Sequence, residues 1–275
     1  MKKESDSYEA WYSKGTALGG EGRYEEALAA FDEAIKTTPD NYEAWYYKGV
    51  CLGTLGRHEE AVAAFGEVTR ITPDVDAAWY YTGVSLGALG RQEEACAAID
   101  EVLRINPDDH DAWHFKGNTL DSLERHEEAI VAYEKAVLLK SDYYEAWFNK
   151  GVALATLDRQ EEAVAAYEKA IAIKPDYHEA WLNKGGVLLK QGQQEEAIAA
   201  FSEAVMIKPD YHEAWYAKGF ALSALDRHEE ALAAYDEAIA VKPDYQAAWY
   251  AKGSACDTLG RKEEAKAAFA KALSG

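Results

Sequence analysis

The chain has 275 residues, of which 28% are charged and 48% hydrophobic, and its formal net charge is −20. This composition is typical of a folded protein. The negative charge argues against nucleic acid and anionic membranes as partners, because both are bound mainly by basic residues. No apolar run is long enough to span a membrane, and no secretory signal is recognisable. Three widely spaced cysteines fit neither a disulfide framework nor a zinc site, so we expect a cytoplasmic protein.

After a short lead-in, residues 1–7, the chain repeats itself every 34 residues, and each unit has a tryptophan as its fourth residue. These tryptophans are Trp11, Trp45, Trp79, Trp113, Trp147, Trp181, Trp215 and Trp249. All six prolines lie 28 residues after a tryptophan, and Ser141 takes that place in the fourth unit. A fixed period is typical of stacked repeats. We therefore predict one repeat domain over 8–275, divided into 8–41, 42–75, 76–109, 110–143, 144–177, 178–211, 212–245 and 246–275.

Each unit predicts two helices. In the fifth unit we expect the first helix from about Glu145 to Leu157, with Asp142 as its N-cap, as Asp6 would cap the first unit. The second helix begins with Glu161 and the glutamate after it, because acids suit a helix N-terminus, and ends before the proline. A glycine follows each tryptophan by four residues. Since glycine costs about 1 kcal/mol against alanine in a helix, we expect it to admit another backbone at close range.

The unit YEAWFNKGVALATLDRQEEAVAAYEKAIAIKPDY (144–177) resembles the tetratricopeptide repeat, a 34-residue pattern of Trp, Leu-Gly, Tyr, Ala, Phe and Pro. The resemblance covers residues 8–275. This chain departs from it in having Lys or Thr before the glycine, and Leu, or Cys256 in the last unit, three residues after it. The resemblance implies an all-α fold, a right-handed α-solenoid or superhelix of eight antiparallel helix pairs. It also implies a non-catalytic scaffold for protein–protein interaction.

A row of lysines occupies the predicted packed face. Seven units have a lysine three residues after the tryptophan, such as Lys48, and only Thr82 breaks the row. At about 100° per residue this position falls among the apolar residues of the first helix. Burying a bare ammonium group costs several kcal/mol, so we expect the stem to lie on the core and the head to reach water or a carboxylate. The Glu-Glu pair that opens the second helix is one candidate partner.

The opposite face of the first helix lines, as the resemblance implies, a concave groove for a partner's peptide. The predicted groove residues are Tyr12, Tyr46, Val50, Tyr80, Val84, His114, Asn118, Phe148, Val152, Leu182, Tyr216, Phe220 and Tyr250. Tyrosine is a common interface anchor, but these aromatic residues could instead pack on the neighbouring repeat. Acids at the second position form the predicted groove rim, where they either cap helices or attract basic residues: Glu43, Asp111, Glu145, Glu179 and Glu213. The expected ligand is therefore a protein or peptide segment, basic or aromatic and apolar in character.

Catalytic and metal signals are weak. His58, His126 and His228 occur in R-H-E-E-A, but no second histidine follows at the spacing of a zinc-binding helix. We interpret them as solvated helix starts, and we expect no catalytic residue, metal or cofactor. The cysteines occupy apolar repeat positions and are expected to be small core residues. Two alternatives stay open, a self-assembly module that forms homo-oligomers through solenoid ends or grooves, and the interaction domain of a larger enzyme.

Overall fold

The computed structural model describes residues 7–274, so the predicted Asp6 cap and most of the lead-in lie outside the described residues. The described part divides into two compact units, 1–141 and 142–275. The first unit contains α1 Tyr8–Gly20, α2 Tyr24–Thr37, α3 Tyr42–Thr54, α4 His58–Ile71, α5 Asp76–Ala88, α6 Gln92–Ile105, α7 His110–Ser122 and α8 His126–Leu139. The second contains α9 Tyr144–Thr156, α10 Gln160–Ile173, α11 His178–Lys190, α12 Gln194–Ile207, α13 His212–Ala224, α14 His228–Val241, α15 Gln246–Thr258 and α16 Lys262–Ser274.

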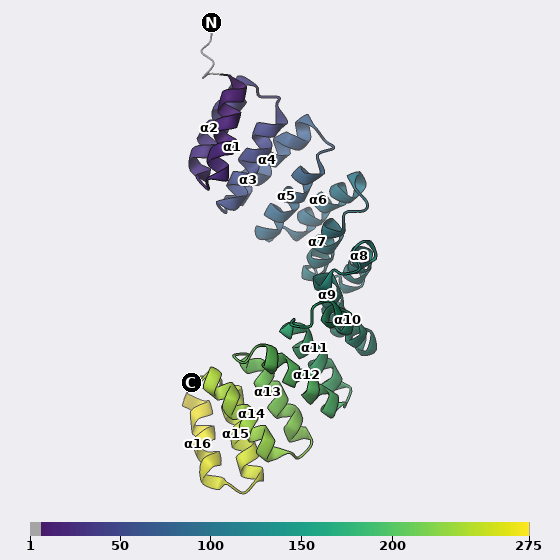
Figure 1. The fold of residues 1–275 in the computed structure, drawn as a ribbon, viewed down its shortest axis with the longest axis vertical. Coiled ribbons are helices and arrows are strands. Elements are labelled where there is room, and N and C mark those ends of the chain that lie inside the picture. Colours follow the sequence, from purple (N-terminus) through teal and green to yellow (C-terminus); the bar gives the residue numbers. More distant parts are fainter. Residues whose placement is uncertain (1–6, 275) are drawn as a thin grey trace. The chain divides into compact units, whose positions relative to one another are not determined.

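Each unit is a helical solenoid stack of four helix pairs, in which every helix packs against the next one along the chain (Figure 1). The first helices of neighbouring repeats also touch directly, α1 with α3 and α3 with α5 in the first unit. In the second unit α9, α11, α13 and α15 form the same kind of row. The first helices therefore line one side of each stack. The predicted all-α fold of eight helix pairs is confirmed.

The repeated glycine brings the two helices of a repeat together. A Cβ atom on Gly49 would lie 2.6 Å from Cε1 of Phe65, a ring that is 1% exposed. At Gly151 the corresponding distance to Tyr167 is also 2.6 Å. The expected close approach is present, but at these positions the close group is a ring from the second helix of the same repeat rather than a backbone. The glycine thus makes room for the largest core side chain of its repeat.

The predicted aspartate cap of the fifth unit is wrong. The N-cap of α9 is Tyr143, which makes no side-chain capping bond, and Asp142 is exposed in the preceding turn. An acid placed before the N-cap residue lies too early for its carboxylate to reach the first free amides of the helix. Side chains do cap three other first helices, in that Ser7, Asn41 and Asp109 accept hydrogen bonds from amides of the first turn.

The lysine row joins successive repeats. The Lys48 ammonium lies 5.1 Å from the centre of the Trp45 ring and 2.7 Å from Oδ1 of Asp32, on the second helix of the preceding repeat. The same bridge, always to the acid sixteen residues earlier, recurs as Lys116–Asp100, Lys184–Glu168 and Lys252–Asp236. As expected, the lysine head reaches a carboxylate beside the core.

The Glu-Glu pair was the wrong candidate for a direct lysine partner. Glu60, the second acid of such a pair, is bonded to Arg57 at 2.6 Å. That bond is the main cause that lowers the pKa of Glu60, and the charge of Lys48 adds a smaller contribution. Where Thr82 breaks the lysine row, the acid position holds Gly66, and the Thr82 hydroxyl donates to the Ala78 carbonyl at 2.8 Å.

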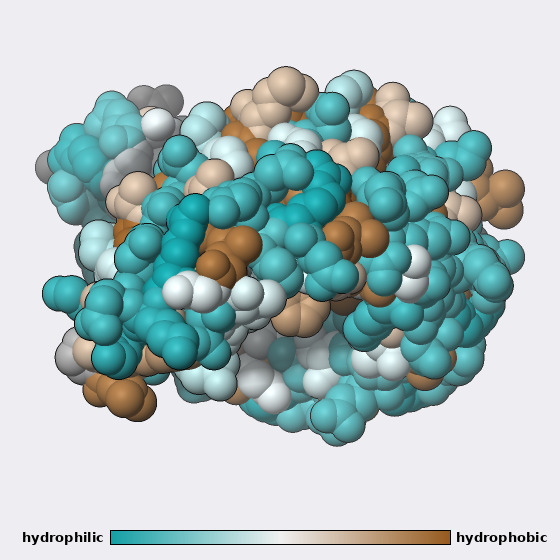
Figure 2. Space-filling view, turned by 90° about the horizontal axis from the view of Figure 1, so that it is seen from below, coloured by the Kyte–Doolittle hydropathy of each residue, from teal (hydrophilic) through white to brown (hydrophobic). Residues whose placement is uncertain are grey.

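The face of the molecule drawn in Figure 2 is mainly hydrophilic. On the face drawn in Figure 2, the apolar residues form small separate groups among hydrophilic ones. No helix within residues 7–274 combines the length and the apolar character that crossing a bilayer would require.

Candidate functional site

The predicted groove residues all lie on first helices. They are distributed over α1, α3, α5 and α7 in the first unit and over α9, α11, α13 and α15 in the second. Because these helices touch one another along each stack, residues from neighbouring repeats line shared pockets.

The second unit contains two adjoining apolar pockets. The first, of about 380 Å³, lies between α11 and α13 and has Leu182, Gly186, Tyr216 and Phe220 in its lining. The second, of about 320 Å³, lies between α13 and α15, where Tyr250 joins Tyr216 and Phe220. Leu182, Tyr216, Phe220 and Tyr250 are thus brought together as predicted groove residues. Apolar pockets of this size with a few polar groups are typical ligand-binding features.

Phe220 and Tyr250 are the most exposed of the predicted groove residues in the second unit. Phe220 is 52% exposed and Tyr250 63%, although neighbouring first-helix residues such as Leu222 are buried. Phe220 lines both pockets, so its ring stands between them. Exposed aromatic side chains beside apolar pockets are a costly arrangement in water, and they are typical of interaction surfaces.

The first unit contains an acidic pocket beside its tyrosines. Tyr46 and Tyr80 line a pocket of about 300 Å³ together with Asp76, Asp109 and Asp111. Burial, followed by the charges of Asp111 and Asp109, raises the pKa of Tyr80. Burial and the neighbouring tyrosines raise the pKa of Tyr46 to about 12. Three carboxyl groups around aromatic walls suit a cationic side chain.

The tyrosines of the first unit also pack on the next repeat. The ring of Tyr12 lies 5.8 Å from that of Tyr47, and Tyr46 lies 6.1 Å from Tyr81. Tyr47 and Tyr81 are each 39% exposed, and sequence reasoning missed them because it did not assign the sixth position of the unit to the groove. The run Trp-Tyr-Tyr, present in both repeats, was the signal that could have found them. Tyr12 and Tyr46 therefore pack on the neighbouring repeat, which was the alternative to a role in ligand binding, and this packing accounts for part of their role.

The histidines that open the second helices are only partly exposed to solvent. His228 is 16% exposed, and it lines the pocket between α13 and α15. His58 lines a pocket of about 210 Å³ in the first unit, together with Val50 and Val84. The His126 ring, 20% exposed, is 2.6 Å from Asp121. The interpretation as solvated helix starts was therefore only partly right, because a residue near the end of the first helix, such as Asp121, lies beside the ring.

The remaining predicted groove residues contact their own repeat. His114 lies 5.9 Å from the Tyr133 ring, whose hydroxyl donates to Asn118 at 2.9 Å. Phe148 lies 5.0 Å from the ring of Tyr177, and Val152 is partly buried on α9.

The rim acids occupy the first turn of their helices, and several lie beside a histidine. His178 is 3.2 Å from Glu179, His212 is 3.0 Å from Glu213, and His110 is 3.6 Å from Asp111. A protonated histidine at these places would compete with a basic ligand for the carboxylate. Glu43 and Glu145 also lie in first turns, those of α3 and α9.

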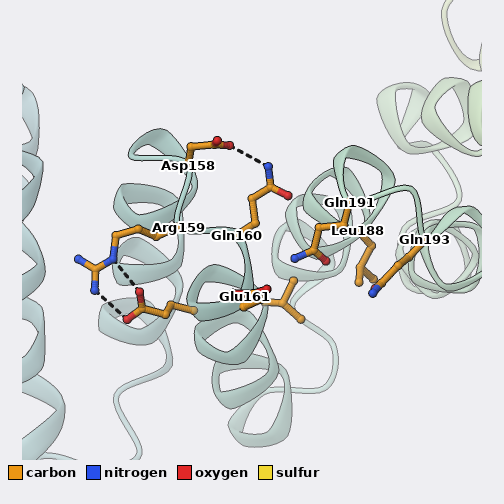
Figure 3. A pocket seen from close by; sticks show the side chains of 9 residues that line it. Asp158, Arg159, Gln160, Glu161, Leu188, Gln191 and Gln193 are labelled. Atoms are coloured by element: carbon orange, nitrogen blue, oxygen red, sulfur yellow. Dashed lines mark hydrogen bonds and ion pairs between the residues drawn. The ribbon is translucent and has the colours of Figure 1, made fainter.

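Another pocket, of about 810 Å³, lies between repeats five and six at the turns that join the two helices of each repeat, away from these groove residues (Figure 3). Its polar side chains pair with one another, since Arg159 bonds Glu162 at 2.7 Å and Gln160 donates to Asp158 at 2.8 Å. Gln193 lies on the opposite wall at a position where all other repeats have arginine. The lining of this pocket is mainly polar, whereas the linings of the pockets beside Phe220 are mainly apolar.

The cysteines are buried thiols, as predicted. Cys51, Cys96 and Cys256 are at most 8% exposed, and burial raises the pKa of each. Within residues 7–274, His, Cys, Asp and Glu side chains form no group of three or more that could hold a metal ion.

Solved structures similar to this chain are helical repeat proteins. YrrB, described as a TPR protein with an unusual peptide-binding site, is 24% identical, with a TM-score of 0.61 over 69% of this chain and 97% of its own. MamA from Desulfovibrio magneticus RS-1 is also 24% identical, with a TM-score of 0.59 over 62% of this chain and 96% of its own. The APC/C hetero-tetramer Cut9–Hcn1 is 16% identical, with a TM-score of 0.57 over 99% of this chain and 54% of its own. At these identities the similarity concerns the fold.

A comparison with curated protein sequences finds no match. Family models described as tetratricopeptide repeat match residues 12–76, 54–110 and 116–178. Further models of the same description match 154–219, 212–245 and 246–274. Together they cover almost the whole chain, which therefore belongs to the tetratricopeptide repeat family.

Proposed function

We propose that this chain is a non-catalytic protein-interaction scaffold that binds a peptide segment of a partner along its first helices. The observation that carries the proposal is the pair of apolar pockets that share Tyr216 and Phe220. The exposed ring of Phe220 offers an anchor for binding, because aromatic residues dominate the free energy of many interfaces. The fold of YrrB, whose description names a peptide-binding site, gives the proposal a precedent.

The first unit adds a preference for basic residues in the ligand. Its pocket of Tyr46, Tyr80 and three aspartates offers both a negative charge and aromatic faces to a lysine or arginine. The formal net charge of −20 favours the approach of such segments.

The proposal can be tested with peptides that are selected from a random display library for binding to the wild-type protein. We expect Phe220→Ala to weaken the selected peptides by about 30-fold, as the loss of a hot-spot residue costs about 2 kcal/mol. Met206→Ala is the matched control, because Met206 is 67% exposed on α12 and lines neither groove pocket. Calorimetric titration gives both affinities. If the selected peptides bound Phe220→Ala as tightly as wild type, the groove would not be their binding site, and this part of the proposal would be rejected.

Self-association is a second candidate, favoured by an exposed apolar pair on α8. Val131 is 55% exposed and Leu138 76%. Other repeats of the first unit have alanine in place of Val131 and lysine or arginine in place of Leu138. In an antiparallel two-fold pair of α8 helices, Val131 would face Leu138, and Glu134 would face Lys135.

A further inference from the structure

The pockets on either side of Phe220 lie between successive first helices of one row. One lies between α11 and α13, the other between α13 and α15, and α13 touches both neighbours directly. Axes of directly packed helices are about 8–10 Å apart. A ligand that fills both pockets must therefore present two side chains separated by about that distance.

The two pockets select an uncharged ligand. The lining of the pocket between α13 and α15 contains no Asp, Glu, Lys or Arg, and the lining of the other contains only Lys190. This is unusual in a chain with 28% charged residues and a net charge of −20. Charge complementarity thus favours apolar side chains here, because a buried charge without a partner is costly.

The spacing distinguishes three backbone conformations. In an extended strand, side chains on the same face are two residues and about 6.6–6.8 Å apart, which is less than the distance between the pockets. An α-helix with side chains i and i+7 in the pockets would bring residues i+3 and i+4 onto Phe220, which is 52% exposed between them. A polyproline II helix has three residues per turn and rises about 3.1 Å per residue, so residues i and i+3 are about 9.3 Å apart. Of the three conformations, only the polyproline II helix matches the distance between the pockets and also places no side chain above Phe220.

The hydrogen-bonding groups of the groove also fit this conformation. The backbone of α11, α13 and α15 is bonded within each helix, so it cannot pair with an added strand. Tyr216 and Tyr250 both line the pocket between α13 and α15, and a phenolic hydroxyl group can donate a hydrogen bond to a ligand carbonyl. Polyproline II segments have free carbonyl groups, and aromatic-lined grooves are known to bind them.

We propose that the α11–α13–α15 groove binds a proline-rich segment in the polyproline II conformation, with prolines i and i+3 in the two pockets and Phe220 between them. Tyr250 and Tyr216 donate hydrogen bonds to carbonyl groups of the segment. This inference rests on the proposed function and names the class of ligand for the same site.

A fluorescently labelled, capped decaproline peptide is the probe, and polarisation is measured with the full chain. We expect saturable binding that exceeds that of a glycine–serine peptide of equal length. Phe220→Ala should weaken decaproline by at least about tenfold. Tyr250→Phe, which keeps the ring, should weaken it by about two- to tenfold, the effect of one hydrogen bond. Met206→Ala should bind as wild type.

Two results would overturn the inference. One is decaproline binding no tighter than the glycine–serine peptide, and the other is decaproline binding that neither Phe220→Ala nor Tyr250→Phe changes. If library-selected peptides still depend on Phe220 in either case, the groove function stands and the polyproline II ligand is rejected. If no peptide depends on Phe220, both proposals fall. Circular dichroism of each variant shows whether the repeat stack is intact.

Discussion

At the scale of residues, the core aromatic position shows which chemical groups the fold needs. Phe31, Phe65 and Phe201 are about 1% exposed, and Tyr167 and Tyr235 fill the equivalent places equally deeply. A ring is therefore the usual group at this position, where it fills the space left by the repeated glycine, although in the third repeat Ile99 fills the same space beside Gly83. The tyrosine hydroxyl is an addition that individual repeats tolerate.

That hydroxyl makes the fold sensitive to alkali. Burial raises the pKa of Tyr167 above its ordinary value of 10.0, so the folded chain resists an ionisation that the unfolded chain undergoes freely. The native state is unaffected below about pH 10, and above it each such tyrosine lowers the free energy of unfolding by up to about 1.4 kcal/mol per pH unit. The half-buried Tyr46, with its pKa raised to about 12, contributes the same kind of loss between about pH 10 and pH 12.

Tyr167→Phe should therefore protect the protein at high pH. We expect its free energy of unfolding to lie within about 1 kcal/mol of wild type at pH 7 and to fall less steeply above pH 10. Urea titrations followed by circular dichroism at several pH values measure both quantities. Parallel pH profiles for the two proteins would contradict the expected role of the buried hydroxyl.

At the scale of elements, sequence periodicity predicted each helix well but not the contacts between helices. The first helix of the fifth unit was expected from Glu145 to Leu157 and extends over Tyr144–Thr156. Periodicity identifies the buried face of a helix but not the neighbour that covers it. For that reason the Asp32 partner of Lys48, which lies on the preceding repeat, was not predicted, and His228 was assigned to solvent although it lines a pocket.

Two glycines of the second repeat should respond oppositely to the same substitution. In Gly49→Ala the new methyl group would meet the Phe65 ring at 2.6 Å, and we expect a loss of about 1–3 kcal/mol in unfolding free energy through overpacking. Gly66 lies in α4 with no neighbouring heavy atom within 4 Å of a built Cβ. Gly66→Ala should thus stabilise the protein by about 1 kcal/mol through helix propensity.

Chemical denaturation of the two glycine variants side by side measures the difference. If both substitutions destabilised the protein, the loss could not be assigned to the single Gly49–Phe65 contact, and helix packing would determine the effect at both positions. A neutral Gly49→Ala variant would show that the ring can move aside at little cost.

At the scale of the whole molecule, the repeat pattern predicted the fold class and the helices that carry the site, but not which repeats differ from the pattern. Thirteen positions were proposed as groove residues from register alone. The structure distinguishes Phe220 and Tyr250, which are exposed beside pockets, from Tyr12 and Tyr46, which pack on tyrosines of the next repeat. That difference depends on neighbouring residues such as Tyr47 and Gly186. The repeat position of one residue does not show which neighbours surround it.

Association of whole chains through α8 is open to a direct test. We expect the weight-average mass from light scattering to rise with concentration for wild type and to stay at the monomer value for Leu138→Glu, because each carboxylate would be buried against Val131 of the other copy in place of an apolar contact. Met206→Glu is the control, since Met206 is similarly exposed but lies on α12. A wild-type mass that is constant over the whole concentration range would exclude this mode of association.

The bridge between a lysine and the acid sixteen residues before it has a consequence for how such a gene can change its length. Each bridge crosses the boundary between two repeats, so a recombination event that removes or duplicates a whole number of 34-residue units brings an acid and a lysine together again at the new junction. Junctions that recruit Gly66 or Ser202 at the acid position would lack the bridge. Copy number can therefore vary with little loss at most boundaries.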